Sequence, residues 1–245
     1  MSGALRIAGG ELPSTDGVRA PRTAMLHRLR PGAQSLVHGW WDVELHGAEH
    51  VPADGPVVMA ANHVGWLDGP LLAIVSPRPV HALTKREMFA GPMGTFLHAA
   101  GQIPLDRWHV DLAAIRTALR VLAEGRAVGV FPEGARGAGD MRTARAGAAY
   151  LALVSGAPVV PVSFLGTRLP GGADDSLPPR GARIAVTYGA PVRLGHHPWP
   201  RTTAQVARAA AAVTTAVTST TRTAEETTGM TLPGPVGPKR EKKRT

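Results

Sequence analysis

The sequence predicts an α/β fold: a single domain in which helices flank a mixed, mostly parallel sheet. Short apolar runs of strand length alternate with segments of helical periodicity through the middle of the chain. The 245 residues suffice for one sizeable core, and no change of composition divides the region from residue 42 to residue 222. We therefore expect one domain over residues 42–222, with segments of a different character at each end.

Seven short runs, rich in Val, Ala and Leu, are typical of buried strands. Glycine, proline or charged residues bound most of them, as expected for strands that end in turns. The predicted strands cover residues 43–46, 57–61, 80–84, 102–105, 127–131, 159–164 and 183–188.

Helical patterns lie between several of these runs. The clearest covers residues 111–124, where apolar residues recur at helical spacing from Leu112 to Leu122 and Gly125 provides a stop. A further helix is expected to begin just after Asp68, with a proline in its first turn. Two more predicted helices cover residues 142–155 and 202–220.

Residues 21–41 form an amphipathic segment that mixes apolar and basic side chains, and we expect it to be helical. The Pro31–Gly32 pair is expected to break it into two pieces. Two interpretations stay open. The segment either lies on a membrane surface, or it packs on the sheet with Trp40 and Trp41 in the core.

The two ends of the chain lack periodicity, and residues 1–20 and 223–245 are predicted to be disordered. The net charge is +9, and the cluster 239–244 contributes part of it. A basic surface suits anionic lipid, phosphorylated ligands or nucleic acid. For the tail itself, a solvated run that keeps the protein soluble is the simplest interpretation, and attraction to an anionic membrane is the next. Aromatic residues are few and no nucleic-acid-binding motif appears, so nucleic acid is not an expected partner.

The chain has no cysteine, which excludes disulfides, cysteine metal sites and a cysteinyl acyl-enzyme. This composition fits a reducing compartment. The first residues lack a signal-peptide pattern, and no uncharged apolar run approaches the ~18–20 residues that span a bilayer. We therefore expect a protein that is soluble or lies on a membrane surface.

The stretch 62–68 places His63 and Asp68 five positions apart, where a predicted strand ends and a predicted helix begins. On one continuous helix the two side chains would point ~140° apart, so they meet only if a turn folds one back on the other, which Gly65 makes easy. A carboxylate that holds one ring nitrogen of a histidine leaves the other nitrogen free to act as a base. Chance alone yields roughly 0.4 such spacings in a chain of this composition, so the pair by itself favours a capping Asp68 beside an incidental His63.

Three further segments place charged residues or a loop at predicted strand boundaries. In 101–107, Arg107 could clamp a phosphate or form a surface ion pair with Asp106 or a neighbour. In 131–136, a Pro-Glu-Gly turn puts Glu133 and Arg136 where a buried strand ends, which suits either ligand binding outside the sheet or a structural salt bridge. The segment 157–162 is a loop that leads into another buried strand.

In this order, the four segments resemble the glycerolipid acyltransferase family, whose best-known members are 1-acylglycerol-3-phosphate acyltransferases. The matching motifs are Asn-His-x4-Asp, a glycine-to-arginine segment, Phe-Pro-Glu-Gly before an arginine, and a Val-Pro strand, and the resemblance covers roughly residues 40–190. Two positions depart from it. The family commonly has Ser where this chain has Gly65, and Thr or Ser where it has Ala135.

The resemblance implies a glycerol-3-phosphate acyltransferase-like fold and transfer of a fatty acyl group from a thioester, acyl-CoA or acyl-ACP, to the free hydroxyl of lysophosphatidic acid. His63 would be the base and Asp68 would orient it. The residues implied to hold the phosphorylated acceptor are Asn62, Lys85, Arg107, Glu133, Gly134 and Arg136. For Lys85, a solvated position on the surface is an equal alternative. Neither a metal nor a cofactor is expected beyond the acyl thioester itself.

The same resemblance implies phospholipid synthesis at the inner face of the cell membrane, with the protein cytoplasmic and peripheral. Alternatives are a different acceptor, such as glycerol-3-phosphate or another lysolipid, and a non-catalytic protein that binds an acyl thioester or lipid. A nucleic-acid binder that uses the basic tail is a fourth, more distant alternative. We expect deletion of residues 223–245 to leave turnover of soluble substrates nearly intact and to weaken binding to vesicles.

Overall fold

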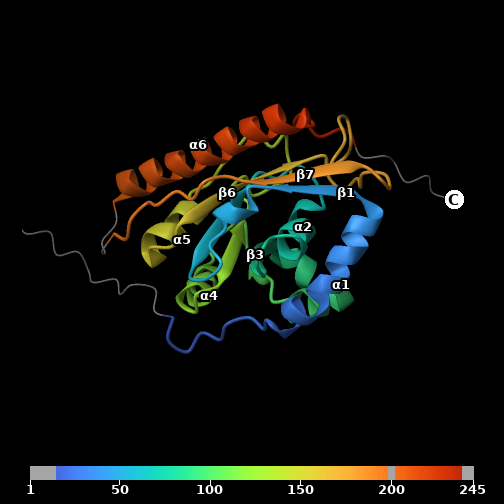
Figure 1. Cartoon of the computed structure of the whole chain (residues 1–245). Coiled ribbons are helices and arrows are strands. Elements are labelled where there is room, and N and C mark those ends of the chain that lie inside the picture. The colour runs from blue at the N-terminus through green and yellow to red at the C-terminus, as the bar shows by residue number, and fades with distance from the viewer. Residues whose placement is uncertain (1–14, 198–201, 239–245) are drawn as a thin grey trace, which may run out of the picture.

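A seven-stranded sheet forms the centre of the computed structural model, which describes residues 15–197 and 202–238 (Figure 1). Its order is β1-β7-β6-β2-β5-β3-β4, and all neighbouring strands are parallel except β6 and β7. The strands are β1 (Asp42–His46), β2 (Val57–Ala61), β3 (Val80–Lys85), β4 (Ile103–Leu105), β5 (Ala127–Val130), β6 (Val159–Leu165) and β7 (Arg183–Tyr188). The predicted single-domain α/β class and the mixed, mostly parallel sheet are confirmed, and every predicted strand is present within one residue at each end.

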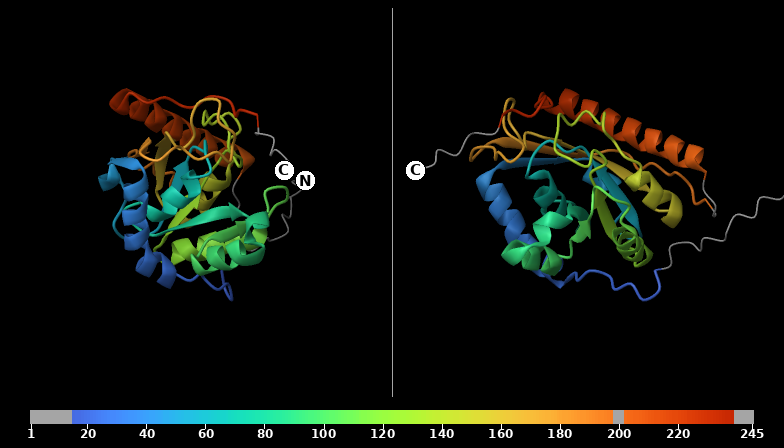
Figure 2. Two further views of the ribbon diagram at one scale, coloured as in Figure 1. Left: turned by 90° about the vertical axis from the view of Figure 1, so that its right-hand side faces the viewer. Right: turned by 180° about the vertical axis from the view of Figure 1, so that it is seen from behind.

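Helices cover both faces of the sheet, as the two further views in Figure 2 show. They are α1 (Ala24–Trp40), α2 (Asp68–Ile74), α3 (Gly91–Ala99), α4 (Leu112–Ala123), α5 (Gly147–Ser155) and α6 (Thr203–Thr228), with short 3-10 helices η1 (Ala48–His50) and η2 (Arg86–Phe89). One apolar core lies between the sheet and α4, α5 and α6, and a second lies between the sheet and α1 and α2. Strand β2 supplies both: Val58 and Ala60 enter the first core, and Val57, Met59 and Ala61 enter the second. A central strand that is apolar on both sides is what a parallel sheet with two covered faces requires.

Helix α4 forms as predicted, and Asp111 caps it by accepting a hydrogen bond from the amide of Ala114 at 3.0 Å. Helix α5 begins only at Gly147, five residues later than predicted. The preceding residues form a loop instead, because the amides of Ala144 and Arg145 bond to the carbonyls of Met141 and Pro132. Helix α3 was not among the predicted elements, although Pro92 in its first turn is a helix-start signal.

Helix α1 runs without interruption through Pro31, so the predicted break is wrong. A proline costs the helix one hydrogen bond, but contacts with α2 hold the two halves in line. Arg30 and Gln34, which lie on either side of the proline, both donate to the carbonyl of Ile74 at 2.9 Å. The alternative of two core tryptophans holds for only one of them: Trp40 is 47% exposed, while Trp41 packs against the core between the sheet and α1.

At the C-terminal end, the structure differs from what the sequence predicts. Helix α6 continues to Thr228, and the chain then runs back over the body of the protein as far as residue 238. The Thr-rich part of α6 has little apolar periodicity, which is why the sequence predicts disorder from residue 223. The predicted disorder of residues 1–14 and of the basic cluster 239–244 falls outside the described residues, while 15–20 are described without helix or strand.

Candidate active site

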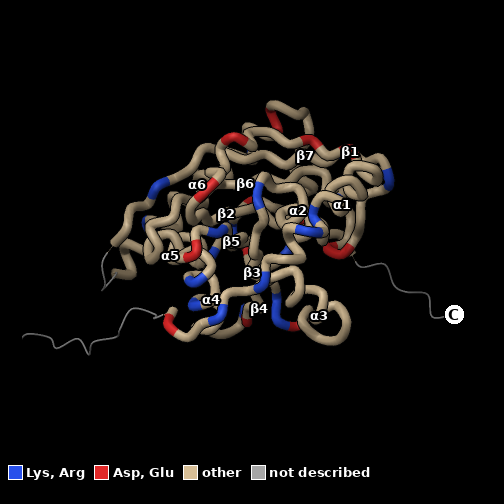
Figure 3. Tube along the Cα trace, turned by 60° about the horizontal axis from the view of Figure 1, so that its bottom comes forward, with Lys and Arg blue, Asp and Glu red and all other residues tan. Residues whose placement is uncertain are grey.

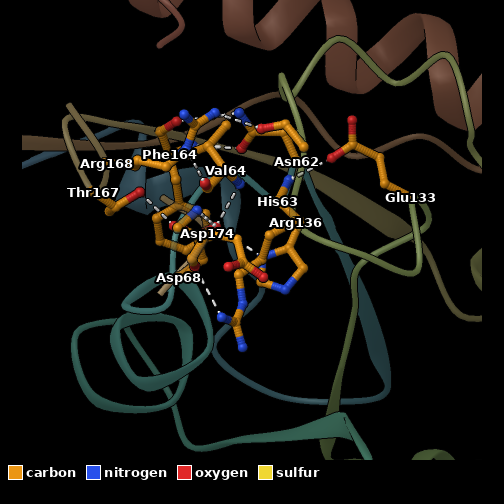
Figure 4. A network of polar contacts seen from close by, with 12 residues as sticks. Asn62, His63, Val64, Asp68, Glu133, Arg136, Phe164, Thr167, Arg168 and Asp174 are labelled. Atoms are coloured by element: carbon orange, nitrogen blue, oxygen red, sulfur yellow. Dashed lines mark hydrogen bonds and ion pairs between the residues drawn. The ribbon is translucent and has the colours of Figure 1, made fainter. Parts of the chain in front are cut away.

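The chemically important segments meet at one edge of the sheet, where parallel strands bring their carboxyl ends together. His63 lies two residues after β2, Lys85 is the last residue of β3, Arg107 follows β4 and Glu133 follows β5. The topology therefore assembles residues that are up to 70 positions apart in sequence, as the hydrogen bond from His63 to Glu133 illustrates (Figure 4).

His63 and Asp68 form the predicted pair: Nδ1 of the imidazole lies 2.8 Å from Oδ2 of the carboxylate. The turn between them is folded by Asp68 itself, which accepts hydrogen bonds from the amides of Val64 at 2.7 Å and Gly65 at 2.8 Å. At Gly65, a Cβ atom would lie 2.7 Å from the carbonyl oxygen of Thr167. The loop after β2 and the loop after β6 can therefore approach this closely only because residue 65 is a glycine.

The Asp68 carboxylate is fully buried at the start of α2. Its other oxygen, Oδ1, accepts a hydrogen bond from the hydroxyl of Thr167. The carboxylate therefore receives donors on both oxygens, which fixes the direction in which it faces His63. Because the carboxylate accepts at Nδ1, the neutral ring carries its proton on Nδ1, and Nε2 is the nitrogen left for chemistry.

The rest of His63 is held just as firmly. Its amide donates to Oε2 of Glu133 at 2.7 Å, and its carbonyl accepts from the amide of Gly137 at 2.8 Å. Its ring stacks on Phe131, with centroids 4.3 Å apart and an angle of 27° between the planes. The imidazole is 16% exposed and lines the main cavity of the protein, so a well-fixed ring faces open space.

Glu133 supports the site from behind, and its predicted contact with substrate stays a prediction. The side chain is buried and does not line the cavity. Its two oxygens accept from the amides of His63 and Met141, at 2.7 and 2.9 Å, which ties the loop after β2 to the loop after β5. Burial raises the pKa of this carboxyl above its usual range, and the two amide hydrogen bonds oppose that shift.

Asn62 likewise has a structural position in place of the predicted substrate contact. It is fully buried, and its carboxamide exchanges two hydrogen bonds with the backbone of Phe164 in β6, at 2.7 and 3.1 Å. The side chain thus extends the pairing of β2 with β6 by one residue and sets the point at which His63 leaves the sheet.

The other predicted site residues do line the cavity: Lys85, Arg107, Gly134 and Arg136. Arg107 donates to the carbonyl of Gly134 at 2.9 Å and lies 4.0 Å from a carboxylate oxygen of the exposed Glu87. Arg136 donates to the carbonyl of Asp174 at 2.9 Å, so a backbone carbonyl orients each guanidinium. Lys85 makes no hydrogen bond or ion pair with any residue that the structure describes. The alternative surface ion pair of Arg107 is present with a neighbour, Glu87, at 4.0 Å, and not with Asp106, whose carboxylate binds His109.

The cavity has a volume of about 640 Å³ and changes character along its length. Lys85, Arg107, Arg136 and His63 line it where strands of the sheet end, and Arg30 of α1 is a further cation in its lining. At the other end, apolar side chains of α1, α2, η2 and α3 line it, and these are Met25, Leu26, Leu29, Pro70, Ala73, Ile74, Met88, Met93, Phe96 and Leu97. Sequence reasoning did not find this apolar end, because α3 was not predicted and three separate helices build it.

Thr167 and Arg168 were also missed. Both follow directly after β6, at the same edge of the sheet as the other site residues, and Arg168 is almost completely buried. The rule that located Glu133, a polar residue just after a buried strand, also applies to these two. Among residues 15–197 and 202–238 there is no group of three or more side chains arranged to hold a metal ion, and no helix there is long and apolar enough to cross a bilayer.

The fold and the site define an α/β protein that holds a histidine–carboxylate pair at the carboxyl edge of its sheet, above a cavity that is basic at one end and apolar at the other. The chain belongs to the acyltransferase family: residues 42–165 match the family described as Acyltransferase. The resemblance inferred from the four sequence motifs is thereby confirmed.

Curated relatives and a solved structure agree with this assignment. The chain is 35% identical over 126 residues to the 1-acyl-sn-glycerol-3-phosphate acyltransferase of Bacillus subtilis, covering 51% of this chain and 63% of that protein. It is 32% identical over 193 residues to the 1-acyl-sn-glycerol-3-phosphate acyltransferase of Chlamydomonas reinhardtii, covering 71% of this chain and 57% of that protein. The match therefore spans about six-tenths of each relative. The crystal structure of the 1-acyl-sn-glycerophosphate (LPA) acyltransferase PlsC from Thermotoga maritima shares the fold, with a TM-score of 0.57, 23% identity and coverage of 83% of this chain and 78% of that one.

Proposed function

We propose that this protein transfers a fatty acyl group from an acyl thioester, acyl-CoA or acyl-ACP, to the free hydroxyl of lysophosphatidic acid, which yields phosphatidic acid. The observation that carries the proposal is the position of His63. Its imidazole is locked by a buried carboxylate and lines one cavity together with cationic and apolar side chains. A reaction that joins an apolar acyl chain to a phosphorylated alcohol needs this combination of surfaces.

In the proposed mechanism, Nε2 of His63 takes the proton of the acceptor hydroxyl as its oxygen attacks the thioester carbonyl carbon. Asp68 keeps the ring oriented and stabilises the imidazolium that forms. When the tetrahedral intermediate collapses, the carbon–sulfur bond breaks, and the departing thiolate takes the proton from the imidazolium. The reaction is balanced without a covalent acyl-enzyme.

The acceptor phosphate is assigned to the basic end of the cavity, with Lys85, Arg107 and Arg136 as its partners. Because backbone carbonyls anchor both arginines, the guanidinium groups are oriented before a ligand arrives. The acyl chain is assigned to the apolar end between α1, α2 and α3.

We further propose that the protein works as a peripheral protein on the anionic inner face of the cell membrane, in the cytoplasm, and not on nucleic acid. Leu29, Met93 and Phe96 support this, since each lines the apolar end of the cavity and is also about half exposed. A lipid acceptor could pass from the membrane to the cavity across these side chains without crossing water.

A different acceptor is the second candidate, and Ala135 favours it. This residue lines the cavity beside Arg136, at the position where the family commonly has a hydroxyl. A missing hydroxyl beside the basic end changes which headgroups are held there, so glycerol-3-phosphate or another lysolipid stays a candidate acceptor.

The central test is His63→Ala, measured as thiol release from acyl-CoA in the presence of lysophosphatidic acid. Removal of the positioned base should lower kcat by about 10²–10⁴ while the fold persists. His109→Ala is the matched control, since His109 is an exposed histidine that also binds a carboxylate, and it should retain full turnover. Unchanged turnover in His63→Ala would exclude the proposed mechanism.

An acceptor panel separates the candidates. Wild-type protein is supplied with acyl-CoA or acyl-ACP and with lysophosphatidic acid, glycerol-3-phosphate or another lysolipid, and products are identified by mass spectrometry. Phosphatidic acid supports the first proposal, and a product formed only with another acceptor supports the second. Binding of the thioester with no product from any acceptor would indicate a non-catalytic binding protein.

A further inference from the structure

Arg168 is a buried cation whose hydrogen bonds all go to backbone carbonyls. It is 1% exposed, yet none of its hydrogen bonds reaches a carboxylate. Burial lowers the pKa of the guanidinium, and the negative charge of Asp68 opposes this. Its acceptors are the carbonyl oxygens of Val64 at 2.7 Å, Gly137 at 2.8 Å, Gly172 at 3.0 Å, Gly234 at 2.6 Å and Pro235 at 3.2 Å.

Two of these carbonyls belong to the loops that hold His63. Val64 lies inside the turn between His63 and Asp68, and its amide is one of the donors to the carboxylate. Gly137 donates its amide to the carbonyl of His63 at 2.8 Å. Thus a single guanidinium fixes the peptide group after His63 and the residue that holds the peptide group of His63 itself (Figure 4).

Two other carbonyls, those of Gly234 and Pro235, belong to the segment 229–238 that follows α6, which we call the C-terminal strap. The strap is tied down at further points: the amide of Gly237 donates to Gly172 at 3.0 Å, and the amide of Leu232 donates to Glu225 at 2.9 Å.

The strap also packs directly on the active-site loops. At Gly139, an added Cβ would lie 3.0 Å from a methyl group of Leu232 and 2.3 Å from a methyl group of Val64. There is room only for glycine between the strap and the turn that carries the catalytic pair. The strap is therefore linked to this turn in two ways: by hydrogen bonds to the guanidinium of Arg168, and by the packing of Leu232.

We propose that Arg168 is a positioning residue for the His63–Asp68 pair, and that the C-terminal strap is a working part of the active site that acts through Arg168. The proposal rests on the function proposed above. Without the strap, the guanidinium loses two of its five acceptors and is opened to water, so its hold on Val64 and Gly137 weakens. The catalytic ring would then keep its bond to Asp68 but lose its fixed position over the cavity.

Kinetics of truncated and substituted chains test the proposal, with short-chain substrates that are free in solution. Arg168→Lys keeps the charge but cannot span five carbonyls, and a chain that ends at residue 230 lacks the strap. Each should lower kcat by about 10–100-fold, as expected when a reacting group is displaced by about 1 Å, with KM for donor and acceptor within about threefold of wild type. For the truncated chain, this outcome differs from the one expected from the sequence alone, which treats residues 223–245 as dispensable for turnover of soluble substrates, because Arg168 binds the carbonyls of Gly234 and Pro235. Removal of residues 239–245 alone is the control and should change neither constant.

Combining Arg168→Lys with strap removal decides whether the strap acts through Arg168. If it does, the double change should cost no more than the larger single change, because both remove the same support. Multiplied losses would overturn the proposed path. A merely structural role would lower the melting temperature and leave kcat of the folded protein intact, and that result would overturn the proposal. Leu232→Ala loosens the strap without a charge change and serves if Arg168→Lys fails to fold.

A spectroscopic measurement tests the positioning role independently of whether the proposed reaction takes place. The proton that His63 donates from Nδ1 to Asp68 should give a downfield proton resonance, identified by its absence in His63→Ala. We expect strap removal and Arg168→Lys to shift or broaden it, and removal of residues 239–245 to leave it unchanged. Should no acceptor be acylated by the wild type, this resonance still tests the positioning role, and an unmoved resonance would refute it.

Discussion

His63 follows strand β2 and His81 lies within strand β3, and their surroundings differ. His63 lines the cavity and is held by a carboxylate. His81 is fully buried, lies 2.6 Å from the carbonyl of Gly101 through Nδ1, and lies 3.2 Å from Arg126 through Nε2. A cation beside Nε2 requires that nitrogen to accept, so the ring is neutral with its proton on Nδ1. Burial is the main reason that the pKa of His81 falls to about 4, and the charge of Arg126 adds to it.

His81 should make the stability of the protein sensitive to acid. Its pKa is about 6.5 in an unfolded chain and about 4 in the native state, so between these values the unfolded state binds the extra proton. The free energy of unfolding is therefore complete above pH 6.5 and falls as the pH drops toward 4, by on the order of 3 kcal/mol in total.

Urea denaturation of wild type and His81→Asn at pH 7 and pH 4.5 measures this contribution. Asparagine can still donate to Gly101 but does not titrate, so its loss of stability on acidification should be smaller by about 2–3 kcal/mol. Equal losses in the two proteins would show that His81 is not responsible.

At the residue scale, the sequence could predict which residues gather but not which way each one faces. The His63–Asp68 pair was predictable because spacing, a glycine and the strand end all favour the same turn. Asn62 and Glu133 lie in the same motifs, but they point into the protein and bond to backbone amides and carbonyls. No local pattern distinguishes a polar side chain that binds backbone from one that binds substrate, since tertiary contacts decide it.

At the scale of elements, strands were predicted more closely than helices. A buried parallel strand is a short apolar run with clear ends, and all seven were found. Helix bounds depend on contacts from elsewhere in the chain: α5 starts late because a loop beside the active site uses the preceding residues, and α6 extends because its threonines pack against the sheet. Buried Thr220, Thr221 and Thr228 illustrate the last case.

Helix α1 offers a direct test of how strongly contacts override local preference. Pro31→Ala restores the amide that the proline lacks, and it should stabilise the protein by up to about 3 kcal/mol. Pro70→Ala is the matched control, because Pro70 lies in the first turn of α2, where a proline costs little. Urea denaturation, with hydrogen exchange of the α1 amides, gives both values. A loss of stability in Pro31→Ala would mean that the contacts of Arg30 and Gln34 with Ile74 depend on the backbone geometry that the proline imposes.

At the scale of the whole molecule, charged and exposed apolar side chains are distributed unevenly over the surface. Figure 3 shows several Lys and Arg positions around α4, β3 and β4, and Lys85 at the end of β3 also lines the cavity. Exposed apolar side chains of α1 and α3 flank the apolar end of the cavity. Composition predicted the excess of positive charge, but only the fold brings basic and apolar regions to the two ends of one cavity.

This arrangement predicts a defined contact with lipid vesicles. Met93→Ser and Phe96→Ser should each weaken binding to phosphatidylglycerol vesicles by about tenfold, since each removes a large apolar side chain that a membrane would bury. Leu177→Ser is the control, because Leu177 is equally exposed but does not line the cavity. Sedimentation with vesicles measures the binding. Equal losses of vesicle binding in all three variants would contradict a membrane contact at Met93 and Phe96.

The pairing of β1 with β7 determines how early in translation the sheet can be completed. Asp42 of β1 is aligned with Arg183 of β7, about 140 residues later in the chain. At the usual rates of translation, roughly 7–28 seconds pass between the two. Throughout that interval the edge of β1 has no partner, so the domain cannot finish folding from its N-terminus onward and must wait for nearly its whole length. A ribosome that pauses before residue 183 would hold an open strand edge exposed for the length of the pause.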